Sequence, residues 1–220
     1  MAGKLYLVTT PIGNLEDITL RALRVLKEVD VIAAEDTRHS RQLLSHFDIH
    51  SELISYHAFN EHDKTDALLS RIENGENIAL VTDAGTPSVA DPGFFLVRAA
   101  QEKGLEIVVV PGVSAVTFAV TASGLPVDKF AFFGFVPVKS GRKTTFFEEI
   151  KEKNMTSFIF ESPFRVAKTL EFIREATKIH EEVIKGSASE VCEQCKNRSW
   201  KGEFVIGIAP QTAADSAGEA

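Results

Sequence analysis

The sequence predicts an α/β fold in which a parallel β-sheet is covered by helices on both faces. Short apolar runs, typical of strands buried on both faces, recur at residues 5–9, 29–34, 52–57, 78–81 and 106–112. Segments with helical periodicity separate these runs, so that strands and helices alternate along the chain. We therefore expect a first α/β domain over residues 1–125.

The helices of this domain follow from apolar stripes and from capping residues. They are expected at a segment with a stripe of Leu20, Leu23 and Leu26, and at residues 38–47, 63–74, 94–103 and 113–123. Asp17 or Thr19 is suited to cap the first of them. Asp91 is predicted to cap the helix at 94–103, with Pro92 as its first residue and Gly104 just beyond its end.

A linker at residues 124–128 leads into a second, shorter α/β domain, expected over residues 126–210. Its strands are predicted at residues 130–136, 156–161 and 202–208, and its helices at 146–152 and from 162 onward. Residues 139–143 are expected to form a basic, flexible loop suited to phosphate. Residues 211–220 are small and polar and are predicted to be a disordered tail.

Composition and charge restrict the classes of function. A hydrophobic content of 44% and a charged content of 25% are ordinary for a globular protein. The net charge of -7 argues against a protein that coats nucleic acid non-specifically, although a specific RNA substrate remains compatible with it. There is no apolar run long enough to span a bilayer and no signal peptide, which predicts a cytoplasmic protein without membrane contact.

No metal site is predicted. Cys192 and Cys195 form a single C-x-x-C without a second pair at zinc-ribbon distance, and their role stays open. His57 and His62 lack a metal-binding spacing and are typical of polar surface groups.

The loop after the fourth strand, residues 82–93, is the strongest candidate for a ligand site. Open α/β sheets bind ligands just beyond the carboxyl ends of their strands. Gly85 and Pro87 restrict the backbone here, and Asp83, Thr86 and Ser88 offer polar groups. The alternative interpretation is a well-capped connection between a strand and a helix.

Three further strand ends carry candidate residues. Residues 9–19 and 111–114 form bent loops that lead from a strand into a helix, where backbone N–H groups can meet a ligand. Glu35, Asp36 and Arg38 follow the second strand, where acidic and basic groups together are candidates for substrate contact. Alternatively, Asp36 is a helix N-cap and Arg38 its solvated neighbour.

A set of motifs in a fixed order carries a resemblance to a known family. The motifs are Thr9-Thr-Pro-Ile-Gly-Asn-Leu, Ala34-Glu-Asp-Thr-Arg, Ser55-Tyr-His, Thr82-Asp-Ala-Gly-Thr-Pro-Ser, Pro111-Gly-Val-Ser-Ala, Gly134-Phe-Val-Pro, Phe160-Glu-Ser-Pro-Phe-Arg and Lys201-Gly-Glu-Phe-Val. The chain closely resembles the bacterial small-subunit ribosomal RNA (cytidine 2′-O)-methyltransferases of the tetrapyrrole methylase superfamily. The resemblance implies two α/β domains of the tetrapyrrole methylase type with S-adenosyl-L-methionine in the cleft between them, and a homodimer.

The same resemblance assigns roles to matching positions. It implies cofactor contacts at Pro11, Ile12, Gly13, Asp83, Gly85, Thr86, Val89, Ser114, Ala115 and Phe160. Asp36 and Glu35 are the candidate catalytic bases, and Arg38, His57 and Lys178 the candidate substrate-binding residues. The substrate would be RNA of the small ribosomal subunit, met by shape and by a few basic residues, namely Arg38, Arg41, Lys139, Arg142, Lys143 and Arg165.

The chain departs from the family pattern in its second domain. Around Phe172 and Arg174 the family normally carries further residues, including a strand, whereas here the sequence runs straight through. Two alternatives to an RNA methyltransferase therefore stay open. One is a sister enzyme that methylates a tetrapyrrole or acts in diphthamide synthesis, against which the residues from Glu35 to Arg38 and from Asp83 to Thr86 argue. The other is a degenerate paralogue that binds RNA or cofactor without turnover.

Overall fold

A computed structural model describes residues 1–177 and 204–209 of the 220-residue chain. Lys178, Cys192, Cys195 and the predicted tail at 211–220 lie outside the described residues. The chain divides into two compact units, Met1–Ser114 and Ala115–Ala220, and each is described by itself.

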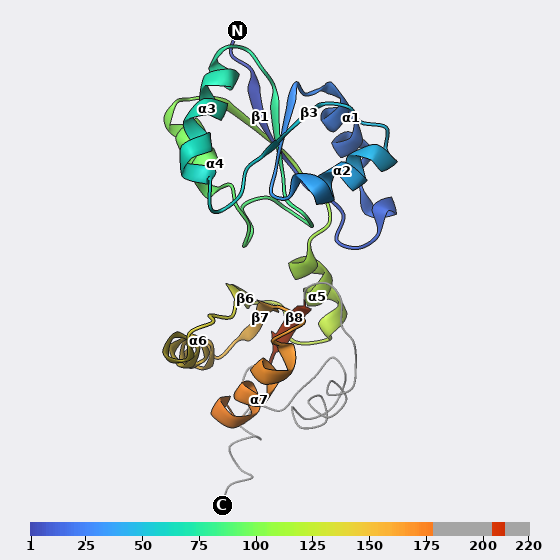
Figure 1. The fold of residues 1–220 in the computed structure, drawn as a ribbon. Coiled ribbons are helices and arrows are strands. Elements are labelled where there is room, and N and C mark those ends of the chain that lie inside the picture. Colours follow the sequence, from blue (N-terminus) through green and yellow to red (C-terminus); the bar gives the residue numbers. More distant parts are fainter. Residues whose placement is uncertain (178–203, 210–220) are drawn as a thin grey trace, which may run out of the picture. The chain divides into compact units, whose positions relative to one another are not determined.

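The first unit contains a five-stranded parallel sheet. Its strands are β1 (Lys4–Val8), β2 (Val31–Ala34), β3 (Glu52–Ser55), β4 (Ile78–Val81) and β5 (Glu106–Val110), in the spatial order β3-β2-β4-β1-β5 (Figure 1). All four neighbouring pairs are parallel. The α/β class and the alternation of strands and helices predicted from the sequence are therefore confirmed.

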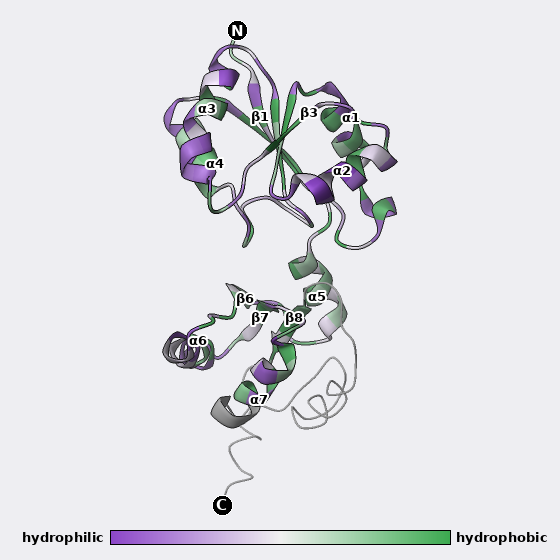
Figure 2. Cartoon of the chain, in the orientation of Figure 1, coloured by the Kyte–Doolittle hydropathy of each residue, from purple (hydrophilic) through white to green (hydrophobic). Residues whose placement is uncertain are grey.

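Helices cover both faces of this sheet. Helices α1 (Leu20–Glu28) and α2 (Thr37–His46) pack on one face, and α3 (Glu61–Glu73) and α4 (Phe94–Glu102) pack on the other. A short 3₁₀ helix, η1 (Leu15–Asp17), precedes α1. The strands are mainly hydrophobic, apart from polar residues at some of their ends, whereas the helices carry many hydrophilic residues (Figure 2).

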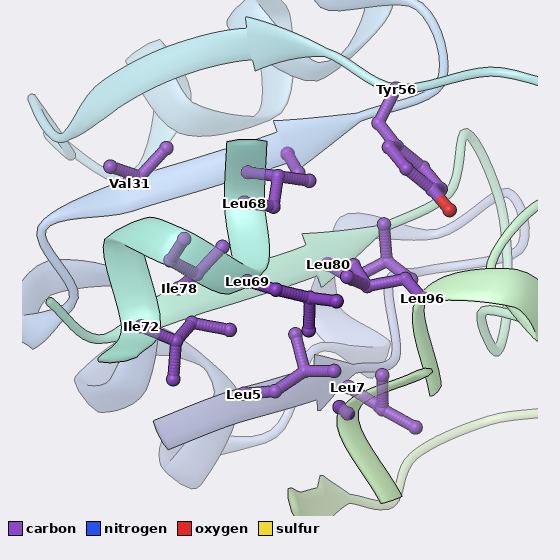
Figure 3. Packing of buried hydrophobic residues seen from close by; sticks show 12 residues of the cluster. Leu5, Leu7, Val31, Tyr56, Leu68, Leu69, Ile72, Ile78, Leu80 and Leu96 are labelled. Carbon is purple, nitrogen blue, oxygen red and sulfur yellow. The ribbon is translucent and has the colours of Figure 1, made fainter. Parts of the chain in front are cut away.

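Each face of the sheet has its own hydrophobic core. In one core, Leu68, Leu69 and Ile72 of α3 pack with Leu5 of β1 and Leu80 of β4 (Figure 3). Because side chains alternate along a strand, the other set of strand residues meets α1 and α2. Every residue of β2 and β4 is buried, so these two strands form the centre of the unit.

The caps of α1 and α2 are those expected from their sequences, and the start of α4 is not. Thr19 Oγ1 accepts a hydrogen bond from the N–H of Ala22 at 3.0 Å. Asp91 was predicted to cap α4, but this prediction is wrong because the helix begins at Phe94 and Gly93 holds the cap position. Gly93 has φ +136, a conformation open to glycine, which lets the chain turn once more before the helix starts.

The second unit contains a mixed three-stranded sheet among its described residues. Strand β6 (Phe130–Phe135) pairs in parallel with β7 (Thr156–Glu161), which pairs antiparallel with β8 (Phe204–Ile208). Helices α6 (Ser140–Lys153) and α7 (Val166–Thr177) share one core with the sheet. Helix α7 is continuous through Phe172 and Arg174.

Helix α5 (Ala115–Ser123) belongs to this second unit, whereas the sequence analysis had grouped it with the first domain. Helix α5 packs against β7 and β8. Its small side chains permit this close approach. The linker-like residues 124–128 follow α5 and therefore predict a domain boundary after this helix, whereas the boundary lies before it.

The basic segment at residues 139–143 is not a flexible loop, so this prediction is wrong. Helix α6 begins at Ser140, and Lys143 turns toward the unit's interior. Lys143 Nζ donates to Thr169 Oγ1 at 3.2 Å and lies 4.7 Å from the centre of the Phe172 ring. Burial lowers the pKa of Lys143.

Arg165, another expected RNA contact, is held by a buried carboxylate. Glu161 is fully buried and accepts hydrogen bonds from Thr169 Oγ1 at 2.6 Å, from the Ser162 N–H at 2.7 Å and from Arg165 Nη2 at 3.2 Å. Arg165 Nη2 also donates to the Val136 carbonyl at 2.6 Å. The network ties β7, α7 and the end of β6 together, as a buried charge requires.

We expect Leu80→Ala to lower the free energy of unfolding of the first unit by about 2 to 5 kcal/mol, because it leaves a cavity between β4 and α4. Leu80 is 1% exposed. Leu20→Ala is the matched control, since Leu20 is 87% exposed and its loss should cost less than about 0.5 kcal/mol. Urea unfolding followed by circular dichroism measures both, and equal effects would contradict the assignment of the core.

Candidate functional site

The site lies at the carboxyl edge of the first unit's sheet, where β1 and β4 are neighbours. Strand β1 is followed by α1 on one face, whereas β4 is followed by α4 on the opposite face. Two adjacent strands whose connections leave in opposite directions open a crevice between their loops. The residues predicted for cofactor binding in the first and central loops follow these two strands.

Backbone hydrogen bonds connect the two loops directly. The Thr10 N–H donates to the Gly85 carbonyl at 2.9 Å, and the Gly85 N–H donates back to Thr10 at 3.1 Å. Thr10 Oγ1 donates to the Thr82 carbonyl at 3.1 Å. Thr9 and Thr86 place their hydroxyl oxygens 3.2 Å apart. The first and central loops are thus joined to each other by backbone groups and hydroxyls, without charged side chains.

The third loop is packed against the first. A Cβ added to Gly112 would lie 2.9 Å from Thr9 Cβ, so only glycine allows this approach. Ser114, the last residue of the first unit, is half-buried, and Ala115, the first residue of α5 in the second unit, is half-buried too.

The central loop concentrates unusual backbone conformations. Gly85 has φ +91, and two non-glycine residues, Ser88 and Ala90, have φ +69 and +65. Each non-glycine residue in this region costs on the order of 1 kcal/mol or more, and such strain gathers at functional sites. Two turns stabilise it, from Ser88 N–H to the Pro92 carbonyl at 3.2 Å and from Val89 N–H to Thr86 at 3.2 Å. This favours a ligand-binding loop over a plain connection.

Thr82, a site residue that no motif role predicts, lies between two acidic side chains. It is buried, and its Oγ1 lies 2.7 Å from Glu35 Oε2 and 2.8 Å from Asp91 Oδ2. The sequence feature that could have identified Thr82 is its place as a polar residue directly after a fully apolar strand. Thr82 therefore fixes Glu35, at the end of β2, against the central loop.

Asp83 has a similar role for the neighbouring residue. Its carboxylate accepts a hydrogen bond from the Asp36 N–H at 3.1 Å. Two successive residues after β4 thus hold the two successive acidic residues after β2. The predicted cofactor residue Asp83 and the predicted catalytic residues Glu35 and Asp36 are brought together at one place.

Asp36 is both the cap of α2 and the partner of Arg38. Its Oδ1 accepts from the Arg38 N–H at 2.8 Å and from Arg38 Nε at 3.1 Å, and its Oδ2 accepts from Nη2 at 2.7 Å. These hydrogen bonds hold the pKa of Asp36 far below its ordinary value and raise that of Arg38. The Arg38 side chain is 88% exposed. The two alternative interpretations of this segment, helix cap and substrate contact, are compatible.

The remaining predicted residues fall into different surroundings. Pro11 is buried, Ile12 half-buried and Gly13 exposed in the first loop, and Val89 is 40% exposed in the central loop. His57 follows β3, and its Nδ1 accepts a hydrogen bond from the Phe59 N–H at 3.3 Å. Phe160 is buried in the second unit, with its ring 4.7 Å from that of Phe132.

Metal-binding clusters and membrane-spanning helices were both sought in the parts of the chain that the structure describes. Residues 1–177 and 204–209 contain no group of three or more potential ligands that could hold a metal ion. Within these same ranges, no helix is long and apolar enough to cross a membrane.

Comparison with known families and sequences gives consistent matches. The family model described as Tetrapyrrole (Corrin/Porphyrin) Methylases matches residues 4–188. The chain is 43% identical over 216 residues to a protein of Halalkalibacterium halodurans named ribosomal RNA small subunit methyltransferase I, covering 93% of this chain and 75% of that one. It is 41% identical to the protein of the same name from Synechocystis, over 97% of this chain and 81% of the relative.

Solved structures show the same fold at much lower identity. A diphthine synthase superimposes with a TM-score of 0.73 at 16% identity, covering 94% of this chain and 90% of that one. The uroporphyrin-III-C-methyltransferase of Thermus thermophilus gives a TM-score of 0.63 at 20% identity, with 94% of each chain covered. These likenesses establish the fold. They do not identify the molecule that accepts the methyl group.

We expect Thr82→Val to destabilise the first unit by about 1 to 3 kcal/mol, because it removes the one hydroxyl proton that either Glu35 or Asp91 can accept. Thr82→Ser keeps the hydroxyl and is the matched control. Adding Glu35→Gln to Thr82→Val should recover part of the loss, since it removes one of the two acidic groups. Urea titration measures all three, and equal stability of the Val and Ser variants would contradict the bridging role.

Proposed function

The chain belongs to the tetrapyrrole (corrin/porphyrin) methylase family, and we propose on this premise that it methylates ribosomal RNA. The reaction is transfer of a methyl group from S-adenosyl-L-methionine to a cytidine ribose 2′-hydroxyl in RNA of the small ribosomal subunit. Relatives with 41% and 43% identity over most of the chain carry the name ribosomal RNA small subunit methyltransferase I, which supports this acceptor.

The donor set of the crevice fits S-adenosyl-L-methionine. The three loops at residues 9–15, 82–93 and 110–115 contain hydroxyl, carboxyl and backbone groups and no lysine, arginine or histidine. Such a lining suits a ligand that carries a positive sulfonium, because carboxyl and carbonyl oxygens attract a cation and no cationic side chain repels it. Ile12 and Val89 offer apolar surface for an adenine ring. We assign the cofactor to these loops, with Gly85 and Thr86 at their centre.

The cofactor supplies an electrophilic methyl group on a good leaving group when it is bound. The protein's task is then mainly to hold the acceptor hydroxyl in line and to accept its proton. Asp36 is a poor proton acceptor, since its pairing with Arg38 lowers its pKa. We therefore assign Asp36 to orienting Arg38, whose exposed guanidinium would contact an RNA phosphate. Glu35, oriented by Thr82, is the better candidate for the base.

Two alternative functions can be distinguished from this one by experiment. Diphthine synthase and uroporphyrin-III-C-methyltransferase share the fold, but at 16% and 20% identity they say nothing about this chain's acceptor. A degenerate paralogue would bind the cofactor or RNA without turnover. The proposal includes a homodimer and a cytoplasmic location, where small ribosomal subunits are found.

The first test is a calorimetric titration with S-adenosyl-L-methionine. We expect saturable binding to the wild-type protein and at least a tenfold weaker affinity for Gly85→Val, since Gly85 has φ +91 and lies in the crevice. Gly104→Val is the matched control: Gly104 also has a positive φ, +67, but follows α4 at the opposite edge of the sheet. Equal affinity of all three proteins would show that the central loop is only structural.

The second test is methyl transfer to small ribosomal subunits from a strain that lacks the enzyme. We expect transfer to these subunits and none to a tetrapyrrole, and we expect Asp36→Asn to lower kcat at least tenfold without changing cofactor affinity. Asparagine keeps the helix cap but loses the fork to Arg38. Transfer to the tetrapyrrole alone would assign a sister enzyme, and transfer to neither would favour the degenerate paralogue.

The pH dependence separates the two acidic residues. Because the pKa of Asp36 is lowered, this carboxyl stays ionised well below neutral pH, and no loss of activity between about pH 5 and pH 8 should come from its titration. Any acid limb of kcat in that range should persist in Asp36→Asn. Disappearance of the limb in this variant would show that Asp36 is the base after all.

A further inference from the structure

The loop between β3 and α3 presents an aromatic ring to solvent. Phe59 is 97% exposed, although a phenylalanine side chain gains about 2 kcal/mol when it is buried. Its one ring neighbour among the described residues is His57, with ring centres 6.0 Å apart and edge-on. A single exposed apolar residue is common and does not by itself indicate a binding role, so the surroundings of Phe59 must supply the evidence.

The backbone that carries Phe59 is fixed. The His57 N–H donates to Asn60 Oδ1 at 2.8 Å, and the N–H groups of Asn60 and Glu61 donate to the His57 carbonyl at 2.9 Å. Asn60 Nδ2 donates back to the Ser55 carbonyl at 3.4 Å. Helix α3 begins directly after the loop, at Glu61. The ring is therefore displayed from a structured turn and does not belong to a fraying end.

The displayed ring lies next to the residues assigned to the acceptor. Strands β2 and β3 pair in parallel, with Ala34 opposite Ser55, and the Tyr56 N–H donates to the Ala34 carbonyl at 2.8 Å. The Phe59 loop and the segment from Glu35 to Arg38 thus leave the same edge of the sheet from neighbouring strands. A nucleotide held by Arg38 would have its neighbours along the RNA chain within reach of this loop.

Charge alone gives this edge little attraction for RNA. Arg38 is paired with Asp36 and follows Glu35 in the chain, and the whole chain has a net charge of -7. Stacking of a base on an aromatic ring does not depend on net charge, and unpaired bases are commonly recognised in this way. It supplies affinity where phosphate contacts are few.

We propose that Phe59 is a binding residue that stacks on an unpaired base beside the acceptor nucleotide. This inference rests on the function proposed above and specifies how the same site recognises its substrate. The chemical class it selects is single-stranded RNA with an accessible base face.

The test compares three side chains at position 59 in methyl transfer to small ribosomal subunits. Phe59→Leu keeps an apolar group but removes the ring face, whereas Phe59→Trp enlarges it. We expect the KM for subunits to rise about tenfold in Phe59→Leu, which corresponds to about 1.4 kcal/mol, and to stay level or fall in Phe59→Trp. The kcat and the affinity for S-adenosyl-L-methionine should change little in both variants.

Salt dependence distinguishes stacking from a charge effect. The slope of log KM against log salt concentration should be the same in Phe59→Leu as in the wild type, because no phosphate contact is lost. Arg38→Gln is the contrast, since it should flatten that slope.

Three results would overturn the inference. An active wild type with equal KM values for phenylalanine and leucine would remove the role of Phe59 and leave the proposed function intact. A wild type without transfer to subunits would remove the proposed function and this inference with it. A changed sedimentation coefficient of Phe59→Leu in the absence of RNA would assign Phe59 to a contact between copies of the chain.

Discussion

The candidate site depends on the pair of backbone hydrogen bonds that joins Thr10 to Gly85. These bonds hold together two loops whose strands are neighbours but whose helices leave to opposite faces of the sheet. Without these bonds the two loops would separate, because they lead to helices on opposite faces of the sheet. With them the crevice has fixed walls, and the residues after β2 can be positioned against one of those walls by Thr82 and Asp83. The arrangement places rigidity where a methyl transfer needs alignment.

The acidic groups of the site have separate tasks because their partners differ. Asp36 is occupied by a guanidinium and a helix N-terminus, which stabilise its charge and reduce its basicity. Glu35 is oriented by a neutral hydroxyl. Two adjacent carboxylates in one short segment thereby have different partners: a guanidinium for Asp36 and a hydroxyl for Glu35.

The sequence was sufficient for the fold class, for the order of elements in the first unit and for the location of the central loop, because apolar periodicity and glycine or proline positions are local signals. It was insufficient where tertiary contacts decide. Asp91 looks like a helix cap, yet Thr82 is its partner, and Lys143 looks like a loop cation, yet it packs on Phe172. The basicity of Asp36 and the exposure of Phe59 depend on neighbours that no pattern in the sequence names.

The complete burial of β4 determines which amides would change their rate of hydrogen exchange when a ligand binds. Its amides are paired with both β1 and β2, so their hydrogens should exchange with solvent only when the whole first unit unfolds. The loop that follows contains the positive-φ residues Gly85, Ser88 and Ala90 and lies outside the ladder of the sheet, so we expect its amides to exchange faster. A steep boundary in exchange rates is therefore built into the chain between Val81 and Asp83. Occupation of the crevice would slow exchange on one side of this boundary long before any change appears on the other.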